Sequence, residues 1–129
     1  MSLKSLNKTQ KDAVEAIDGP ILIFAGAGSG KTRVLTHKLF YLVDEGLYKP
    51  EEILAVTFTN KAAREMKERV MKLLKKNELD LSMGTFHSIC ARILREDIET
   101  LGFSKQFAIY DVKDQLDLIK VIFEEFEIS

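Results

Sequence analysis

The amino-acid sequence predicts a three-layer α/β domain, in which helices cover both faces of a parallel β-sheet. Two observations lead to this fold class. Short apolar runs alternate with longer stretches of helical periodicity along the whole chain, which is typical of consecutive strand–helix units. The apolar runs are also too continuous for strands that expose one face to water, as antiparallel strands commonly do. The length of 129 residues is that of one domain.

The apolar runs predict the strands, and the periodic stretches between them predict the helices. We expect strands over residues 21–25, 53–58, 81–83 and 107–110. A first helix around Val14 follows Asn7, a residue type that favours the N-cap position. Further helices are expected over residues 34–42, 63–74, 86–94 and 116–123, because apolar side chains recur there every three to four positions. Gly46 and Gly102 follow two of these helices and are expected to end them.

Composition excludes several classes of protein. With 46% hydrophobic and 30% charged residues, the chain is not intrinsically disordered. Uninterrupted apolar runs, such as residues 21–25, are much shorter than the ~20 residues of a membrane-spanning helix. Cys90 is the only cysteine, which excludes a disulfide framework and a multi-cysteine zinc site. We therefore expect a soluble, cytoplasmic protein without membrane contact.

Charge is unevenly distributed, although the formal net charge is only −1. Residues 61–76 contain seven basic and two acidic side chains, whereas residues 96–129 contain nine acidic and three basic ones. A near-neutral chain can therefore still present a basic face to phosphate groups. The alternative interpretation of the basic run is a solvated helix face with Glu–Lys pairs.

A glycine-rich segment carries the strongest chemical signal. It follows the first apolar run, precedes a helical stretch, and reads Ala25, Gly26, Ala27, Gly28, Ser29, Gly30, Lys31 and Thr32. Glycines let backbone N–H groups turn toward an anion, and the next helix directs its first N–H groups to the same point. We expect Lys31 to contact the β- and γ-phosphates of a nucleoside triphosphate, and the Thr32 hydroxyl to bind Mg²⁺. The alternative is a turn of small residues with an incidental lysine, and Ala25 departs from the usual glycine at the first position.

A complete phosphate-loop hydrolase also needs a carboxylate at the end of a neighbouring strand, to hold the metal's water and activate the attacking one. Residues 39–45 end in Asp44 and Glu45, but they lie within the helix that the loop opens. Residues 107–111 end in Asp111 and lack a following glutamate. The hydrolytic site is therefore expected to be incomplete.

Four segments together resemble the UvrD/Rep branch of the superfamily 1 DNA helicases. They span residues 6–14, 25–33, 57–63 and 84–88, and are similar, in this order, to the family's Q motif and its motifs I, Ia and Ib. The resemblance implies a RecA-like phosphate-loop NTPase domain over residues 1–110 and the start of an inserted helical subdomain over 111–129. It also implies ATP and Mg²⁺ as cofactors, single-stranded DNA or a DNA duplex junction as partner, and a second, C-terminal RecA-like domain later in the same chain. We therefore expect an incomplete domain, the N-terminal piece of a longer helicase.

The resemblance assigns roles to individual residues. Gln10 would read the adenine edge with its amide, and Arg33 would lie near the nucleotide; the alternative for both is an exposed helix residue. Phe58 would stack on a DNA base, although its apolar neighbours alone are equally consistent with a buried strand end. The remaining DNA contacts would come from Thr59, Asn60, Lys61, Thr85 and His87, of which Asn60 also suits an N-cap and His87 a plain helix start.

The phosphate loop and the resemblance together predict the ATP-binding N-terminal portion of an ATP-dependent 3′–5′ DNA helicase, with the polarity implied by the resemblance alone. The 129 residues by themselves are expected to bind nucleotide and to hydrolyse almost none. Alternatives are the motor of a helicase–nuclease of the AddA/RecB type, a small phosphate-loop kinase, and a nucleotide-gated DNA-binding module. The pathway is left open, whether DNA repair, replication or recombination.

Overall fold

The computed structural model describes residues 3–26 and 28–127. The chain divides into two compact units, Met1–Ala91 and Arg92–Ser129. The first unit contains two strands and most of the helices. The elements are, in order, η1 (Leu3–Ser5), α1 (Lys8–Glu15), α2 (Lys31–Asp44), η2 (Pro50–Glu52), β1 (Leu54–Thr57), α3 (Asn60–Leu74), β2 (Ser82–Thr85), α4 (Phe86–Asp97), η3 (Ile98–Leu101) and α5 (Val112–Glu125).

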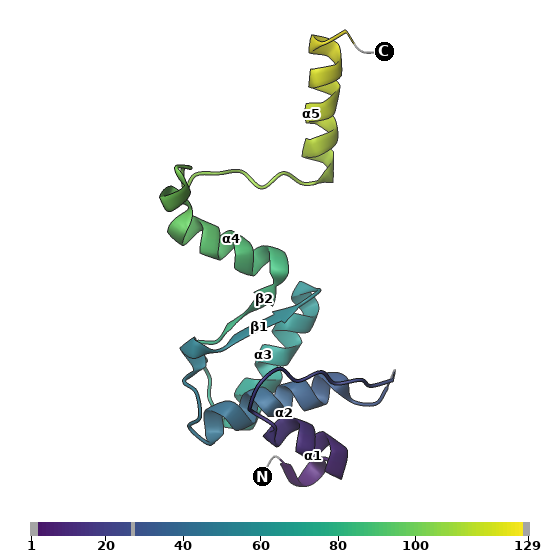
Figure 1. The fold of residues 1–129 in the computed structure, drawn as a ribbon, viewed down its shortest axis with the longest axis vertical. Helices are drawn as coiled ribbons and strands as arrows, with labels where there is room; N and C mark the ends of the chain where they lie inside the picture. The colour runs from purple at the N-terminus through teal and green to yellow at the C-terminus, as the bar shows by residue number, and fades with distance from the viewer. Residues whose placement is uncertain (1–2, 27, 128–129) are drawn as a thin grey trace. The chain divides into compact units, whose positions relative to one another are not determined.

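A parallel pair of strands forms the centre of the first unit. β1 and β2 lie side by side, with Leu54 opposite Ser82 and Thr57 opposite Thr85 (Figure 1). A parallel pair needs a crossover connection, and α3 provides it. The sequence therefore predicted the α/β class correctly, and both strands lie within one or two residues of their expected bounds.

The core lies where α2 and α3 pack on the strand pair. Its buried members come from α2, from β1 and the residue before it, from α3, and from the approach to β2: Leu39, Ile53, Ala55, Met66, Val70, Leu79 and Leu81. Val70 is completely buried. In β1, Ala55 and Thr57 are buried while Leu54 is exposed. One face of this strand therefore points into the core, as the two-residue periodicity of a strand requires.

Helix ends follow the local signals in the sequence. Asn7 caps α1, because its side chain accepts from the backbone N–H of Gln10 at 2.9 Å. α2 ends at Asp44 with Glu45 as its C-cap, so these two carboxylates are helix-end residues, as predicted. Gly102 ends η3 in the left-handed region, at φ 79°.

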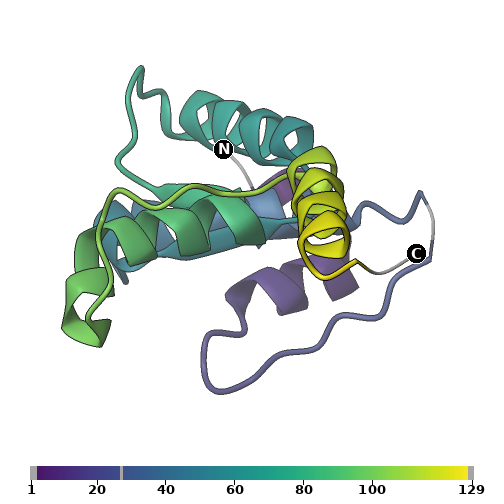
Figure 2. The same cartoon turned by 90° about the horizontal axis from the view of Figure 1, so that it is seen from above.

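Two of the four predicted strands are absent. Residues 21–25 and 107–110 have no regular secondary structure. A strand forms only where a second backbone accepts its hydrogen bonds, and the sheet over the described residues contains β1 and β2 alone. Figure 2 shows residues 21–25 as an extended trace separate from the two strands. Leu22 is 77% and Phe24 90% exposed, so no second layer covers this segment within the described part of the chain.

The second unit consists of the end of α4, η3 and α5. Arg95 lies over the ring of Phe107, with the guanidinium carbon 5.7 Å from the ring centroid. Asp111 is the N-cap of α5 and forms a capping box with Asp114, so its carboxylate serves the helix. Every described residue of α5 is exposed. No helix among residues 3–26 and 28–127 combines the length and apolarity that a membrane crossing requires.

Candidate nucleotide site and nucleic-acid interface

The glycine-rich loop forms a cradle at the N-terminus of α2. Gly28 and Gly30 adopt φ of 74° and 89°, which residues with a Cβ atom rarely adopt. Gly30 is the N-cap of α2, and no side chain caps this helix end. Its first N–H groups therefore stay available to an anion. Ala27 lies outside the described residues.

The departure at Ala25 does not strain the backbone. Among described residues other than glycine, only Lys75 and Glu127 have positive φ. The alanine therefore sits in an ordinary conformation, and a glycine is not required there. The loop is further closed by Ser29, whose backbone N–H and hydroxyl both donate to the Gly26 carbonyl, at 3.3 and 2.7 Å.

Lys31 points back into the loop. Its ammonium donates to the carbonyl oxygens of Ala25 and Gly26, each at 2.7 Å. The Lys31 ammonium, which is predicted to contact a phosphate, thus lies at the beginning of the glycine-rich loop. Thr32 occupies the first turn of α2, and its carbonyl accepts from the Thr36 hydroxyl at 2.7 Å.

Gln10 links α1 to the loop. Its Nε2 donates to the Ser29 carbonyl at 3.1 Å, and its Oε1 accepts from the Asn7 backbone N–H at 3.2 Å. These contacts fix the orientation of the amide, because a flipped amide would set its NH₂ against the Asn7 N–H. An amide has two N–H donors and two acceptor positions, so one donor and one acceptor remain for a ligand. A Cβ added at Gly30 would lie 3.1 Å from Gln10 Nε2, so the close approach of α1 also favours glycine there.

Arg33 connects the same helix to the N-terminal segment. Its Nη2 donates to the Ser5 carbonyl at 2.8 Å. The predicted nucleotide residues that the structure describes therefore lie on three adjoining segments: α1, the loop, and the first turn of α2. Arg33 also ties the first turn of α2 to η1.

The ends of the two strands carry a pair of aromatic rings. Phe58 follows β1 and Phe86 follows β2, and their ring centroids are 6.0 Å apart with an interplanar angle of 53°. Phe58 is 92% exposed and Phe86 54%. Phe58 is therefore not a buried strand end, and both rings offer faces to a ligand.

Phe86 is the residue that sequence reasoning missed. Helical periodicity assigned it to an apolar stripe of α4. A signal was present, because the last residue of each strand is a threonine followed by a phenylalanine, in Thr57-Phe58 and in Thr85-Phe86. The parallel register pairs Thr57 with Thr85, which brings the two rings together.

The start of α3 differs by one residue from the prediction. Thr59, not Asn60, is the N-cap, and its hydroxyl accepts from the Ala62 N–H at 3.2 Å. Both residue types are good caps, and Thr59 has the extended backbone that a cap needs. Asn60 is thereby the first helical residue, with an exposed side chain.

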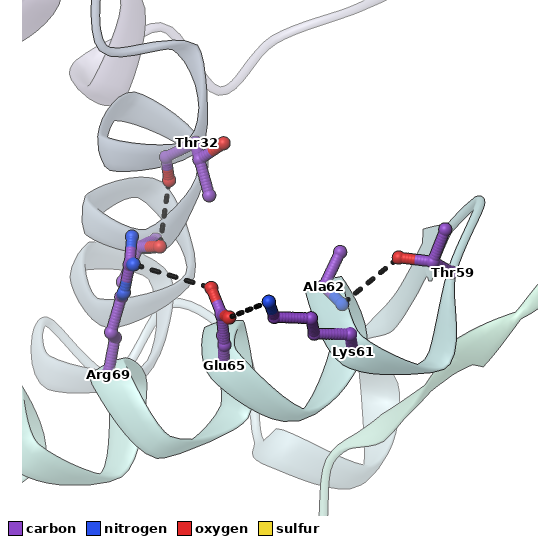
Figure 3. A network of polar contacts seen from close by, with 7 residues as sticks. Thr32, Thr59, Lys61, Ala62, Glu65 and Arg69 are labelled. Atoms are coloured by element: carbon purple, nitrogen blue, oxygen red, sulfur yellow. Dashed lines mark hydrogen bonds and ion pairs between the residues drawn. The ribbon is translucent and has the colours of Figure 1, made fainter.

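The basic residues of α3 are largely exposed. Figure 3 shows Lys61, Glu65 and Arg69 in a row along the helix, with Glu65 within 4.0 Å of Lys61 and 3.5 Å of Arg69. Part of the basic run therefore forms ion pairs along the helix, one of them the kind of Glu–Lys pair that the alternative interpretation predicts. Next to this row is a hollow of about 390 Å³, whose lining includes Asn60, Arg64, Lys67 and Ser88.

The start of α4 holds the last predicted DNA contacts. Thr85 and Ser88 exchange hydrogen bonds: the Thr85 N–H donates to Ser88 Oγ at 2.9 Å, and the Ser88 N–H donates to Thr85 Oγ1 at 3.2 Å. His87, between them, is exposed. A Cβ at Gly84, in β2, would lie 2.4 Å from Ser88 Oγ, so glycine at this position leaves room for the Ser88 hydroxyl.

Over residues 3–26 and 28–127, no three or more histidine, cysteine, aspartate or glutamate side chains gather in a group that could hold a metal ion. The oxygen donor predicted for Mg²⁺ is the Thr32 hydroxyl, which is exposed at the mouth of the loop. A hydroxyl oxygen fits this hard cation, which keeps several waters and takes few protein ligands.

Comparison with known proteins identifies the family. A sequence model of the UvrD/REP helicase N-terminal domain matches residues 6–129. The chain is 55% identical over 123 residues to "ATP-dependent DNA helicase PcrA" of Bacillus subtilis (strain 168), and 52% identical over 127 residues to the protein of the same name in Staphylococcus aureus (strain Mu50). These alignments cover 95% and 98% of this chain, but the chain spans only 17% of the length of either relative. The chain belongs to the UvrD/REP helicase N-terminal domain family.

Proposed function

We propose that this chain is the ATP-binding N-terminal portion of an ATP-dependent DNA helicase that moves 3′–5′ along single-stranded DNA. The observation that carries the nucleotide part is the hydrogen bond from Gln10 Nε2 to the Ser29 carbonyl, 3.1 Å long. It joins a base-reading amide directly to a phosphate-binding loop. The printed names of the relatives support the helicase part.

Each nucleotide contact has a defined task. The N–H groups at the start of α2 and the Lys31 ammonium hold the phosphates, and the Thr32 hydroxyl binds Mg²⁺. Bound Mg²⁺ neutralises charge on the phosphate oxygens. To bind the phosphates, the Lys31 ammonium exchanges its hydrogen bonds with the Ala25 and Gly26 carbonyls for phosphate oxygens. Gln10 offers its spare N–H and acceptor to the N7/N6 edge of adenine, which has a matching acceptor and donor, whereas the N7/O6 edge of guanine presents two acceptors.

The nucleic-acid part rests on the two aromatic rings. Phe58 and Phe86 are exposed at the ends of adjacent parallel strands, and exposed aromatic faces stack on bases of single strands. Thr59, Asn60, Lys61, Thr85 and His87 surround them, at the starts of α3 and α4. Helix N-termini and hydroxyl groups bind backbone phosphates. The hollow beside Asn60 continues this surface toward Arg64 and Lys67.

We further propose that the activity belongs to a longer protein with a second RecA-like domain. The exposed apolar side chains of Leu22 and Phe24, with no paired strand over residues 21–25, support a sheet that other residues complete. The inserted subdomain is proposed to begin at Asp111, the N-cap of α5. The 129 residues alone are then expected to bind ATP without appreciable hydrolysis, because the sequence offers no carboxylate suited to activating water.

A chimera tests the proposal directly. Residues 6–129 replace the matching segment of the Bacillus subtilis relative, and the chimera is assayed for ATP hydrolysis stimulated by single-stranded DNA. Unwinding is compared on duplexes with a 3′ or a 5′ single-stranded tail. We expect activity on the 3′-tailed duplex and its loss in a Lys31→Ala chimera. A folded chimera that binds ATP and lacks both activities would contradict the helicase assignment, and preference for the 5′ tail would contradict the polarity.

A binding experiment separates the rival functions on the chain itself. A labelled ATP analogue is competed with ATP, GTP and AMP in the presence of Mg²⁺. We expect ATP to compete better than GTP and Gln10→Ala to remove this difference. Equal competition by GTP would instead indicate a generic phosphate-loop protein.

A further inference from the structure

The position of Gln10 depends on a short helix. α1 has eight residues, Lys8–Glu15, and Val14 is its buried side chain. An isolated helix of this length is unstable in water, so contacts with the rest of the unit must hold it. Its neighbour is α2, the helix that starts at the phosphate loop (Figure 1). A contact that holds α1 on α2 therefore also holds Gln10 on the loop.

Lys38 of α2 provides such a contact at the C-terminal end of α1. Its ammonium donates to the carbonyl oxygens of Ala13 at 3.2 Å, of Val14 at 3.5 Å, and of Ala16, the C-cap residue. The last carbonyls of a helix have no N–H partners within the helix, and the helix dipole places partial negative charge there. The last turn of α1 contains no basic residue. Lys38 therefore provides from α2 the cation that α1 lacks.

The surroundings of Lys38 favour this role over a surface ion pair. The side chain is partly buried, and burial lowers the pKa of Lys38 because desolvation penalises the ammonium. No carboxylate forms an ion pair with it in the part of the chain that the structure describes. The three carbonyl oxygens compensate for the lost hydration. Just before the N-terminus of α1, Arg33 donates to the Ser5 carbonyl of η1 at 2.8 Å. Two cations of α2 therefore hold the chain at the two ends of the short helix.

We propose that Lys38 is a positioning residue for base selection. By holding the last turn of α1 on α2, it keeps the Gln10 amide on Ser29 and its spare donor and acceptor directed at the base. The inference rests on the proposed ATP binding. It separates two parts of the affinity: the loop and Lys31 bind the triphosphate, whereas Lys38 acts only on recognition of the base.

The test compares four variants with the wild-type chain. Lys38→Met removes the cation, Lys38→Arg retains one, and Gln10→Ala removes the amide. Lys11→Met is the matched control, because Lys11 lies on α1 itself and its ion pair is with Glu15, at 3.5 Å on the surface. ATP, GTP and inorganic tripolyphosphate each compete with a labelled ATP analogue in Mg²⁺. Hydrogen exchange at the amides of residues 8–15 is measured on the same samples.

We expect Lys38→Met to reduce the preference for ATP over GTP by roughly tenfold, the scale of a lost charge-assisted contact. Tripolyphosphate affinity should stay unchanged, and exchange over residues 8–15 should accelerate. Lys38→Arg and Lys11→Met should keep the wild-type preference. If Lys38 contributed only to the stability of the fold, Lys38→Met would lower the affinity for ATP, GTP and tripolyphosphate by the same factor. If circular dichroism shows Lys38→Met to be unfolded, Lys38→Gln, which retains a donor without charge, takes its place with the same expectation of reduced preference.

The outcomes distinguish this inference from the proposed function. Unchanged base preference in Lys38→Met, together with a lost preference in Gln10→Ala, would overturn the positioning role and leave the proposed function standing. Equal weakening for ATP, GTP and tripolyphosphate would also overturn it. Failure of the wild-type chain to bind ATP would overturn the proposed function, and the inference with it.

Discussion

Phe58→Ala is expected to weaken binding of single-stranded DNA while leaving the fold nearly intact. The ring is 92% exposed, and its aromatic contact is with Phe86, at a centroid distance of 6.0 Å. A buried aromatic pair contributes about 0.5–1.5 kcal/mol, and this exposed pair belongs at or below the lower end. The free energy of unfolding, measured by urea denaturation, should therefore fall by less than about 1 kcal/mol.

The expected loss of DNA affinity is larger. Stacking of one base on an aromatic side chain is worth about 1–3 kcal/mol. At 1.4 kcal/mol per factor of ten, Kd should rise roughly 5- to 150-fold. The assay is fluorescence anisotropy with a labelled oligothymidylate at low salt. Phe103→Ala is the matched control, because Phe103 is also exposed, at 66%, and lies in the second unit.

Salt dependence separates stacking from phosphate contact. Phe58→Ala should leave the slope of log Kd against log salt unchanged, because the ring neutralises no phosphate. Lys61→Ala should lower the magnitude of this slope by about one. Equal Kd values for Phe58→Ala and Phe103→Ala would refute the stacking argument. So would a changed slope in Phe58→Ala.

Three further substitutions test the local geometry, each by urea unfolding. Gly30→Ala should lower the free energy of unfolding by about 1–2 kcal/mol, because it places a Cβ at a residue with φ 89° and close to Gln10. Gly26→Ala is the control: its Cβ meets open space, and it should lower the free energy of unfolding by less than half as much. Equal losses in the two variants would contradict this reasoning. Gly84→Ala should lower the free energy of unfolding through the 2.4 Å approach to Ser88 Oγ, and it should cost much less when it is added to a Ser88→Ala variant, which lacks that oxygen. An equal cost in both backgrounds would place the strain elsewhere. Val70→Ala should cost about 2–3 kcal/mol, because Val70 is fully buried in the core, and a cost below about 1 kcal/mol would indicate a core that collapses around the cavity.

The helices and caps could be predicted because their signals are local. Asn7 starts α1 and Gly46 follows the end of α2, as predicted. Gly102 ends η3, which follows α4, whereas α4 itself ends five residues earlier, at Asp97. The one-residue difference at Thr59 and Asn60 has the same cause, since two adjacent residues both suit the cap. The periodicity of apolar residues likewise predicted the bounds of α3 and α5 to within a few residues. The apolar face of a helix is formed by residues of one continuous stretch of sequence, so it can be recognised without knowledge of the rest of the fold.

The missing strands and the aromatic pair could not be predicted in this way, because they depend on partners distant in sequence. Residues 21–25 are apolar enough for a strand, but pairing requires a second backbone. The Phe58–Phe86 contact exists only because the parallel register sets Thr57 opposite Thr85. In the nucleotide site, the residue types gave the expected roles of Gln10 and Lys31, while their present hydrogen-bond partners follow from the path of the chain.

The unpaired segment over residues 21–25 is expected to promote self-association in concentrated solution. Its backbone N–H and C=O groups are not paired in a sheet, and Leu22 and Phe24 present large apolar side chains beside them. Such a stretch is a template on which a second molecule can add as a strand. The formal net charge of −1 gives little electrostatic repulsion against it. Self-association should therefore increase steeply with concentration, and a charged residue at Leu22 should suppress it, which light scattering can follow.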